Sequence, residues 1–196
     1  MMDLVPAAAM DELKSMLSPA RFEHSRRVLV TCGTLAQAWN FPYAKRENLE
    51  WAALFHDCAK EIPREESLRW LQVDGCPFGS ELLDTPGLVH APLGARIVKQ
   101  RYGITNPDVL RAIAYHATGH RDLTSIGWMV YIADYLEPGR KFVKNRDVLI
   151  NESCADPLTG LRLVTELRHH LTGAKGRRIH PLALEYRAYL ESIERL

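Results

Sequence analysis

The chain has 196 residues, of which 46% are hydrophobic and 25% charged, and this composition suits one domain with a sizeable core. Its 25 Lys and Arg residues nearly balance its 24 Asp and Glu residues, giving a formal net charge of +1. This balance excludes a global attraction to nucleic acid or to a membrane surface. No run approaches the ~20 apolar residues of a transmembrane helix, so no membrane partner is expected.

The cysteines point to a reducing compartment. The four of them form no C-x-x-C pair, and the first residues lack the basic start of a secretory signal. We therefore expect a cytoplasmic protein in which each thiol is free and serves as a small buried hydrophobic group. They are Cys32, Cys58, Cys76 and Cys154, and whether Cys58 makes a neighbouring site sensitive to oxidation stays open.

Helical patterning runs through nearly the whole chain, while strand-like alternation is scarce, so the predicted fold class is an all-α helical bundle. We expect a single domain over residues 1–196, with its core motifs at about 21–140 and the helices of 145–196 completing the bundle. Prolines and glycines mark most predicted helix ends. The predicted helices are 10–17, 19–39, 45–60, 63–75, 91–102, 107–119, 124–136, 147–154, 157–171 and 181–196, with a loop at 76–87 and a basic loop at 173–176.

Ionisable residues fall on the apolar faces of several of these helices. His24, for example, lies on the same helical face as Val28 and Leu35. Burying such groups without partners is costly, and imidazole nitrogens and carboxylate oxygens can share one divalent cation instead. Besides His24, these residues are His56, Asp57, His116 and Asp134. A sixth such residue, His90, lies between apolar residues in LVHAP.

Each of these residues has a plainer explanation when it is taken alone. An inward histidine such as His24 or His90 is more often a satisfied core residue than a ligand, and Asp134 could be a cap or an ion-pair partner. The order H…HD…H…H…D on successive helices is hard to produce by accident, however. The sequence therefore predicts a metal centre.

The order His24, His56-Asp57 and Asp134 is the signature of HD-domain metal-dependent phosphohydrolases, and longer segments narrow the resemblance. LFHDCAK, LVHAPLGA, AIAYHATG and YIADYLEPGR together resemble the YqeK family of bacterial symmetrical bis(5'-nucleosyl)-tetraphosphatases. The resemblance covers the chain from about Arg21 to its C-terminus. It implies that the fold is an HD-domain helical bundle. It also implies symmetric hydrolysis of dinucleoside polyphosphates, with diadenosine tetraphosphate giving two ADP.

The resemblance also implies a metal cofactor. We expect a divalent transition metal, foremost iron, as one or two ions, with manganese and cobalt as alternatives that spacing does not separate. A metal-bound water is then expected to attack a phosphorus atom, because a cation lowers the pKa of the water it binds. The implied metal ligands are His24, His56, Asp57, His90, His116 and Asp134, with Asp57 bridging two ions.

Catalytic roles are assigned to Asp57 and Lys60, which stands one helical turn after His56. Positive side chains near the metal should offset the charge of a polyphosphate. The predicted substrate-binding residues are Arg27, Lys60, Thr118, Gly119, His120 and Arg140.

The chain departs from the family pattern at a few positions that remove no ligand. Cys58, Ala91 and Ala117 replace residues that are frequent in the family, and His120 stands where an arginine is common. His169, His170 and His180 are predicted to lie at the surface, and GAKGRR over 173–178 to be a solvated basic loop or a cover over the nucleotide.

Two alternative functions stay open at this point. One is another HD-type nucleotide phosphohydrolase, such as a 5'-nucleotidase or a cyclic-dinucleotide phosphodiesterase. The other is a metal-binding regulatory module without turnover, because a fold does not guarantee catalysis. A nucleotide is the expected partner, nucleic acid is not, and the sequence leaves room for a homodimer.

Overall fold

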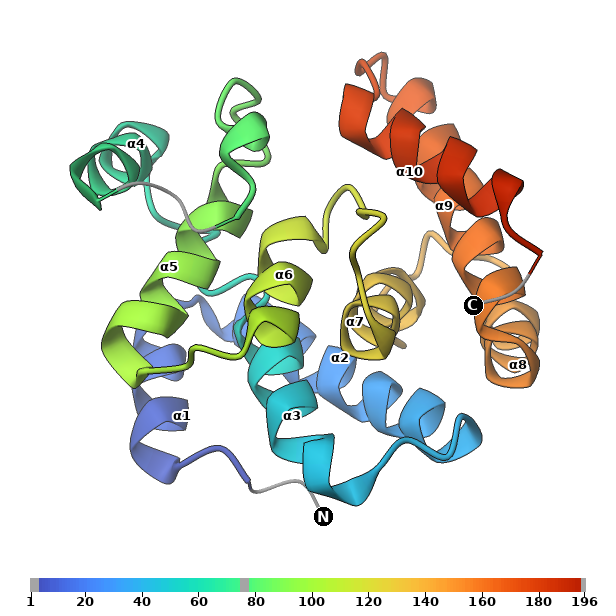
Figure 1. Ribbon diagram of the computed structural model, residues 1–196, viewed down its shortest axis with the longest axis horizontal. Coiled ribbons are helices and arrows are strands. Elements are labelled where there is room, and N and C mark those ends of the chain that lie inside the picture. Colours follow the sequence, from blue (N-terminus) through green and yellow to red (C-terminus); the bar gives the residue numbers. More distant parts are fainter. Residues whose placement is uncertain (1–3, 75–77, 195–196) are drawn as a thin grey trace.

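The computed structural model describes residues 4–74 and 78–194, and the regular elements within these ranges are all helices (Figure 1). The predicted all-α fold class is therefore confirmed. The elements are α1 (Ala7–Met16), α2 (Pro19–Ala38), the 3₁₀ turn η1 (Tyr43–Lys45), α3 (Arg46–Phe55), α4 (Arg64–Asp74), the 3₁₀ turn η2 (Ser80–Leu82), α5 (His90–Tyr102), α6 (Pro107–Tyr115), α7 (Ser125–Leu136), α8 (Arg146–Ala155), α9 (Pro157–Ala174) and α10 (Pro181–Ser192).

Local sequence signals begin and end most of these helices. Proline stands in the first turn of α2, α6, α9 and α10, where its missing N–H would have had no helical partner. The side chain of Asn106 caps α6 by accepting a hydrogen bond from the Asp108 N–H at 2.9 Å. Gly103 follows α5 with a φ of +68°, a conformation that glycine adopts without steric cost.

Two predicted helices end sooner than expected, and both differences affect the site. The helix predicted over 45–60 stops at Phe55, and the one predicted over 107–119 stops at Tyr115. Residues 56–61 form successive tight turns, with the Cys58 N–H bonded to the Phe55 carbonyl at 3.1 Å and the Lys60 N–H to the Asp57 carbonyl at 2.9 Å. His56 and His116 thus cap their helices instead of lying inside them.

Other helix boundaries differ from the predictions by a few residues. The first helix begins at Ala7 instead of 10, α9 continues to Ala174, and α10 ends at Ser192. The predicted loop at 76–87 contains η2 within residues 78–87. Its first two residues lie outside the described ranges, as does the predicted helix end at residue 75.

The core lies where α2, α3, α6 and α7 meet. α2 packs against both α3 and α7, and α6 packs against α3, α5 and α7. Each large apolar side chain that becomes fully buried stabilises the fold by about 1.5–3 kcal/mol. Fully buried examples from these helices are Leu35, Leu54, Phe55, Ile113, Met129 and Ile132.

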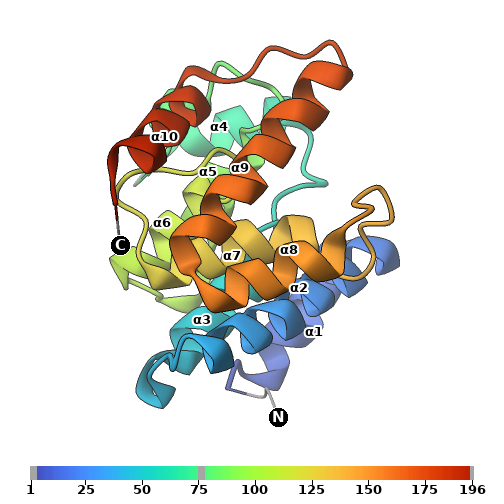
Figure 2. The same cartoon turned by 90° about the vertical axis from the view of Figure 1, so that its right-hand side faces the viewer.

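The last helices extend the bundle on one side. α8 packs on α9, and α9 packs on α7 and α10. Figure 2 shows α9 rising from α8 past α7, with the segment between α9 and α10 at its far end. In Figure 1, α4 and η2 lie on the opposite side of the molecule from α9 and α10.

The thiols behave largely as expected. Cys32 and Cys58 are buried and Cys154 is partly buried, and all three are free, whereas Cys76 lies outside the described residues. Burial raises the pKa of Cys58 to about 12, so its reactive thiolate is scarce near neutral pH.

Among the described residues, no helix combines the length and apolar content that a bilayer crossing requires.

Candidate metal centre

The six residues predicted as metal ligands come from five helical segments, and all of their side chains are buried. Four of the six lie at a helix end or directly after it, where side chains of neighbouring helices can approach each other. They are His24 on α2, His56 and Asp57 after α3, His90 at the start of α5, His116 after α6 and Asp134 on α7.

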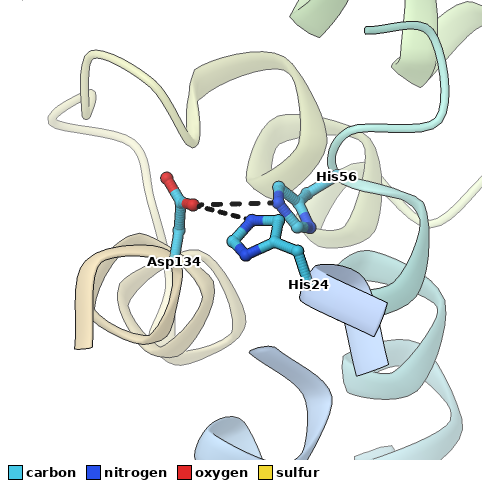
Figure 3. Close-up of side chains that lie close together, drawn as sticks. All are labelled: His24, His56 and Asp134. Atoms are coloured by element: carbon cyan, nitrogen blue, oxygen red, sulfur yellow. Dashed lines mark ion pairs between the residues drawn. The ribbon is translucent and has the colours of Figure 1, made fainter. Parts of the chain in front are cut away.

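A first group of ligand atoms gathers between α2 and α7. The side chains of His24, His56 and Asp134 each offer a ligand atom, and these atoms lie within 4.8 Å of one another. His24 Nε2 lies 3.1 Å from Asp134 Oδ1, and His56 Nε2 lies 3.9 Å from the same oxygen. Figure 3 shows both imidazole rings facing this carboxylate.

A second group shares His56 with the first. His56, Asp57 and His116 again place ligand atoms within 4.8 Å of one another. His116 Nε2 lies 3.4 Å from Asp57 Oδ1, and His90 Nε2 lies 3.1 Å from the same oxygen and 3.3 Å from His116 Nε2. Asp57 Oδ2 lies 3.8 Å from His56 Nε2, the ring nitrogen of the residue that the two groups share.

Unpaired carbonyls at two helix ends orient two of the imidazole rings. Nδ1 of His56 donates to the Ala53 carbonyl at 2.8 Å, and Nδ1 of His116 donates to the Ile113 carbonyl at 2.8 Å. The last carbonyls of a helix lack helical partners, so a histidine at the C-cap satisfies one of them. With the proton on Nδ1, the Nε2 lone pair of each ring points to the centre, as in metal-binding histidines.

The donor atoms fit a divalent cation. His56 Nε2 and Asp57 Oδ1 are buried and have no hydrogen-bond partner among the described residues. Burial lowers the pKa of His56 to about 3, so its ring is neutral and free to ligate near neutral pH. Burial opposes ionisation of Asp134, but the His24 hydrogen bond and the Arg140 charge hold its pKa well below the usual range. Neutral imidazoles beside ionised carboxylates form a typical transition-metal site.

Cationic side chains border the same carboxylates. Arg21 Nη1 donates to Asp57 Oδ2 at 2.6 Å, and Lys60 Nζ lies 3.7 Å from Asp57 Oδ1. Arg140 forms an ion pair with Asp134 and also donates from Nε to its backbone carbonyl at 2.7 Å. Lys60 and Arg140 therefore reach the centre, as the sequence led us to expect, whereas the contact of Arg21 was not predicted.

Glu137 is a buried partner of the centre that sequence reasoning missed. Its Oε1 lies 3.1 Å from His24 Nδ1, which orients the third ring. Its Oε2 accepts from Arg27 Nε at 2.5 Å and from the Gly139 N–H at 2.5 Å. The available signal was a carboxylate one helical turn after Asp134, within the YIADYLEPGR segment.

Arg168 is a second missed residue, and no local signal could have revealed it. Its guanidinium carbon lies 3.9 Å from the ring centroid of Tyr131 and 4.0 Å from that of Tyr135. Its Nη2 lies 3.3 Å from Asp134 Oδ2 and donates to the Tyr131 carbonyl at 2.6 Å. Arg168 therefore contacts Oδ2 of Asp134, whereas Oδ1 of the same carboxylate faces His24.

A cavity of about 830 Å³ opens onto the centre, and Asp57, His116 and Asp134 form part of its wall. Among the predicted substrate contacts, Lys60, Thr118 and Arg140 also line this cavity. The Thr118 hydroxyl is buried and has no hydrogen-bond partner among the described residues, so its O–H can donate to an oxygen of a ligand. Arg27 is not among the lining residues, and Glu137 holds its guanidinium.

The remaining two predicted substrate contacts lie elsewhere. Gly119 has a φ of +76°, and a Cβ added there would lie 1.9 Å from Tyr186 Cδ1, so the glycine makes room for α10. The His120 ring stacks on Tyr115 with 4.3 Å between centroids, and its Nδ1 accepts from the Asp122 N–H at 3.1 Å. His120 lines a separate depression beside α10, and neither residue lines the cavity at the centre.

The predicted surface histidines have three different positions. His170 is exposed, as expected, but the prediction for His169 was wrong, because that residue is only 8% exposed and lines the cavity. His169 lies on α9, which packs against α10, and its ring interacts with the Ala183 backbone of that helix. His180 is partly buried, lines the same cavity and caps α10 by accepting from the Leu182 N–H at 3.2 Å.

Residues 21–139 match the family model described as the HD domain. A Bacillus subtilis (strain 168) protein named bis(5'-nucleosyl)-tetraphosphatase, symmetrical, is 37% identical over 131 residues, which cover 66% of this chain and 68% of the relative. A Staphylococcus aureus (strain NCTC 8325 / PS 47) protein of the same name is 34% identical over 154 residues, covering 73% of each chain.

The fold agrees with a solved structure as well. A Clostridium acetobutylicum protein described as a predicted HD superfamily hydrolase involved in NAD metabolism has a TM-score of 0.84 and 33% identity to this chain. The similarity covers 94% of this chain and 96% of that one. The chain therefore belongs to the HD-domain family and, within it, to the family of symmetrical bis(5'-nucleosyl)-tetraphosphatases.

Proposed function

We propose that this protein is a metal-dependent hydrolase that splits diadenosine tetraphosphate, and related dinucleoside polyphosphates, symmetrically into two nucleoside diphosphates. The observation that carries the proposal is a cavity whose wall contains both metal-ligand carboxylates, Asp57 and Asp134, together with the cations Lys60 and Arg140. A buried centre for the chemistry and positive charge for a polyphosphate chain thus lie in one cavity. The names of the Bacillus and Staphylococcus relatives support the same activity.

The metal ligands are proposed in two sets that share Asp57. The first set is His24, His56 and Asp134, and the second is His90 and His116. We propose iron as the metal, with manganese and cobalt as alternatives, because a nitrogen-rich donor set suits these ions better than magnesium. When bound, the metal supplies a Lewis acid that makes water a better nucleophile near neutral pH.

The remaining residues orient the substrate and offset its charge. Lys60 Nζ lies 2.9 Å from His90 Nε2 and lines the cavity, so it can neutralise a phosphoryl oxygen beside the centre. Arg140 presents a guanidinium from the α7 side, and Thr118 offers a hydroxyl without a protein partner. One P–O bond of the anhydride breaks as water adds to phosphorus, and the departing diphosphate leaves as an anion because terminal phosphate pKa values lie near ~6.

One assay tests the function. The protein is purified without oxygen, its bound metals are measured, and it is incubated with diadenosine tetraphosphate while the products are separated by chromatography. We expect ADP as the sole product and loss of turnover on chelation. ATP plus AMP would contradict symmetric cleavage and leave a metal-dependent hydrolase. No turnover by the metal-loaded protein would contradict the proposal itself.

Substrate profiling separates the alternatives within the family fold. Nucleoside monophosphates and cyclic dinucleotides test the other HD-type activities, and we expect both to be poorer substrates than diadenosine tetraphosphate. Absence of turnover with iron, manganese and cobalt each supplied would favour the regulatory module. We also propose a cytoplasmic location, a single domain over residues 1–196 and a homodimer as the state to test by light scattering.

A further inference from the structure

The cavity above the metal centre extends well beyond the predicted substrate contacts. Its wall includes Asp57 and Asp134 at one end and Lys175, Arg177 and Arg178 at the other. These three cations, which we call the distal cation cluster, lie at the end of α9 and in the segment that leads to α10. Figure 2 shows this segment at the end of α9 that is farthest from α8.

One face of α9 connects the two ends. Arg168, Thr172 and Lys175 all line the cavity, and their spacing of four and three residues places them on the same side of the helix. At 1.5 Å of rise per residue, Arg168 and Lys175 are about 10 Å apart along the helix axis. Because Arg168 contacts Asp134, a ligand that reaches from the metal centre to Lys175 must be elongated.

The two ends differ in how their charges are paired. At the metal end, Arg21 and Arg140 form ion pairs with Asp57 and Asp134. The cations of the distal cation cluster are exposed, and none of them forms an ion pair with a carboxylate in the described part of the chain. Three unpaired positive charges within four residues repel one another, and an anion in the cavity would relieve that repulsion.

The end of α9 holds the distal cation cluster in a defined shape. Gly176 has a φ of +64°. The Gly176 N–H bonds to the Gly173 carbonyl at 2.9 Å, and the Arg177 N–H bonds to the Thr172 carbonyl at 3.2 Å. This pair of bonds is the Schellman motif, in which a left-handed residue closes the helix and fixes the direction of the chain that follows.

His169 supplies a second observation that indicates a ligand on this wall. It is 8% exposed and lines the cavity between Arg168 and the distal cation cluster. Within residues 4–74 and 78–194, neither ring nitrogen makes a hydrogen bond of ordinary length and angle, and the Ala183 backbone supplies only a weaker polar interaction. The hydrogen-bonding capacity of this buried imidazole is therefore not fully used, and a polar ligand in the cavity would take up the remainder.

We infer that the distal cation cluster, with His169 beside it, binds the phosphates in the half of a dinucleoside polyphosphate that lies away from the metal centre. Arginine pairs with phosphate in a bidentate way and lysine acts as a point charge. The cluster would therefore make the enzyme prefer long anionic chains to small phosphate esters. This inference rests on the proposed function and adds the residues that set its specificity.

The test combines three substitutions, Lys175→Gln, Arg177→Gln and Arg178→Gln, in the full chain. All three side chains are exposed, so the fold should be retained. We expect the KM for diadenosine tetraphosphate to rise about tenfold, equivalent to ~1.4 kcal/mol of binding. The KM for p-nitrophenyl phosphate, which cannot reach the cluster, should change far less. Added salt should raise the wild-type KM for the dinucleotide more than that of the variant, because salt screens exposed charges.

A matched control removes the same charge from another surface. Lys14→Gln, Lys45→Gln and Lys99→Gln replace three exposed lysines that are absent from the cavity wall, and this variant should keep a wild-type KM. Equal KM values for the cluster variant and the control would overturn the inference while wild-type turnover still supported the function. If metal-loaded wild type does not cleave the dinucleotide at all, the proposed function fails and the inference fails with it.

Discussion

At the metal end of the cavity the six candidate ligands are buried and cations pair with both carboxylates, whereas at the α9–α10 end three cations are exposed and have no carboxylate partner among the described residues. Charges in a buried site interact strongly because the effective dielectric constant is low there. Charges at an exposed site are screened by salt and can adapt to a ligand. The comparison suggests that chemistry belongs to the first region and substrate capture to the second.

Replacing Asp57 tests the metal end with the largest expected effect. Asp57 is the proposed shared ligand of the two metal sets, so Asp57→Ala should lower kcat by at least ~10³-fold, because a metal contributes several kcal/mol to such reactions. Turnover of diadenosine tetraphosphate gives the rate, and circular dichroism checks that the helical fold is retained. Asp147→Ala, at a side chain that is 91% exposed, is the control. Near-normal turnover of Asp57→Ala would contradict the two-metal proposal.

A smaller effect is expected at Glu137, which contacts the candidate ligand His24 and is not itself a candidate ligand. Glu137→Gln keeps the shape of the side chain but removes the charge that faces His24 Nδ1. Loss of such a partner typically costs 10–100-fold in metal affinity, so we expect about that reduction. Competition with a chelator measures the affinity, and Glu23→Gln, with a side chain 51% exposed, provides the control. Unchanged metal affinity would show that Glu137 does not orient the His24 ring.

Arg140 serves both the metal end and the substrate-binding part of the cavity, because it contacts Asp134 and also lines the cavity wall. Arg140→Ala should raise the KM for diadenosine tetraphosphate by about tenfold, or ~1.4 kcal/mol, and should raise the KM for p-nitrophenyl phosphate less. Metal content is measured alongside, so that loss of the ion is recognised. The control is Arg26→Ala, at a side chain that is 59% exposed. Equal increases for both substrates would count against a role for Arg140 in polyphosphate binding.

An effect on folding stability instead of activity is expected at the turn that presents the distal cation cluster. Gly176→Ala places a side chain at a φ of +64°, which costs about 1–2 kcal/mol of folding stability. Gly173→Ala, in the last turn of α9 where a Cβ would meet no atom within 4 Å, should be neutral or stabilising. Urea denaturation measures both variants. If the two changes have the same effect on stability, the left-handed conformation of Gly176 imposes no cost on a side chain there.

Much of the fold and most residues of the candidate metal centre could be predicted from local patterns. Apolar periodicity marked the helices, and prolines such as Pro107 and Pro181 marked their first turns. The six candidate ligands were found because polar residues on apolar faces need partners. The structure gathers five of them into two groups and places His90 Nε2 3.1 Å from Asp57 Oδ1. Helix ends were harder to predict, because periodicity does not show where the hydrogen-bonded turns stop, as at Phe55.

The sequence by itself thus determined the helices, their order and the six candidate ligands, because hydrogen bonds within a helix and the spacing of apolar faces are local properties. Only the tertiary structure decided which distant groups support the site. Glu137 meets His24 across 113 positions of the chain, and Arg168 meets Asp134 across 34. His169 faces a cavity instead of solvent for the same reason. These contacts depend on how α2, α7 and α9 pack together, and no local pattern encodes that packing.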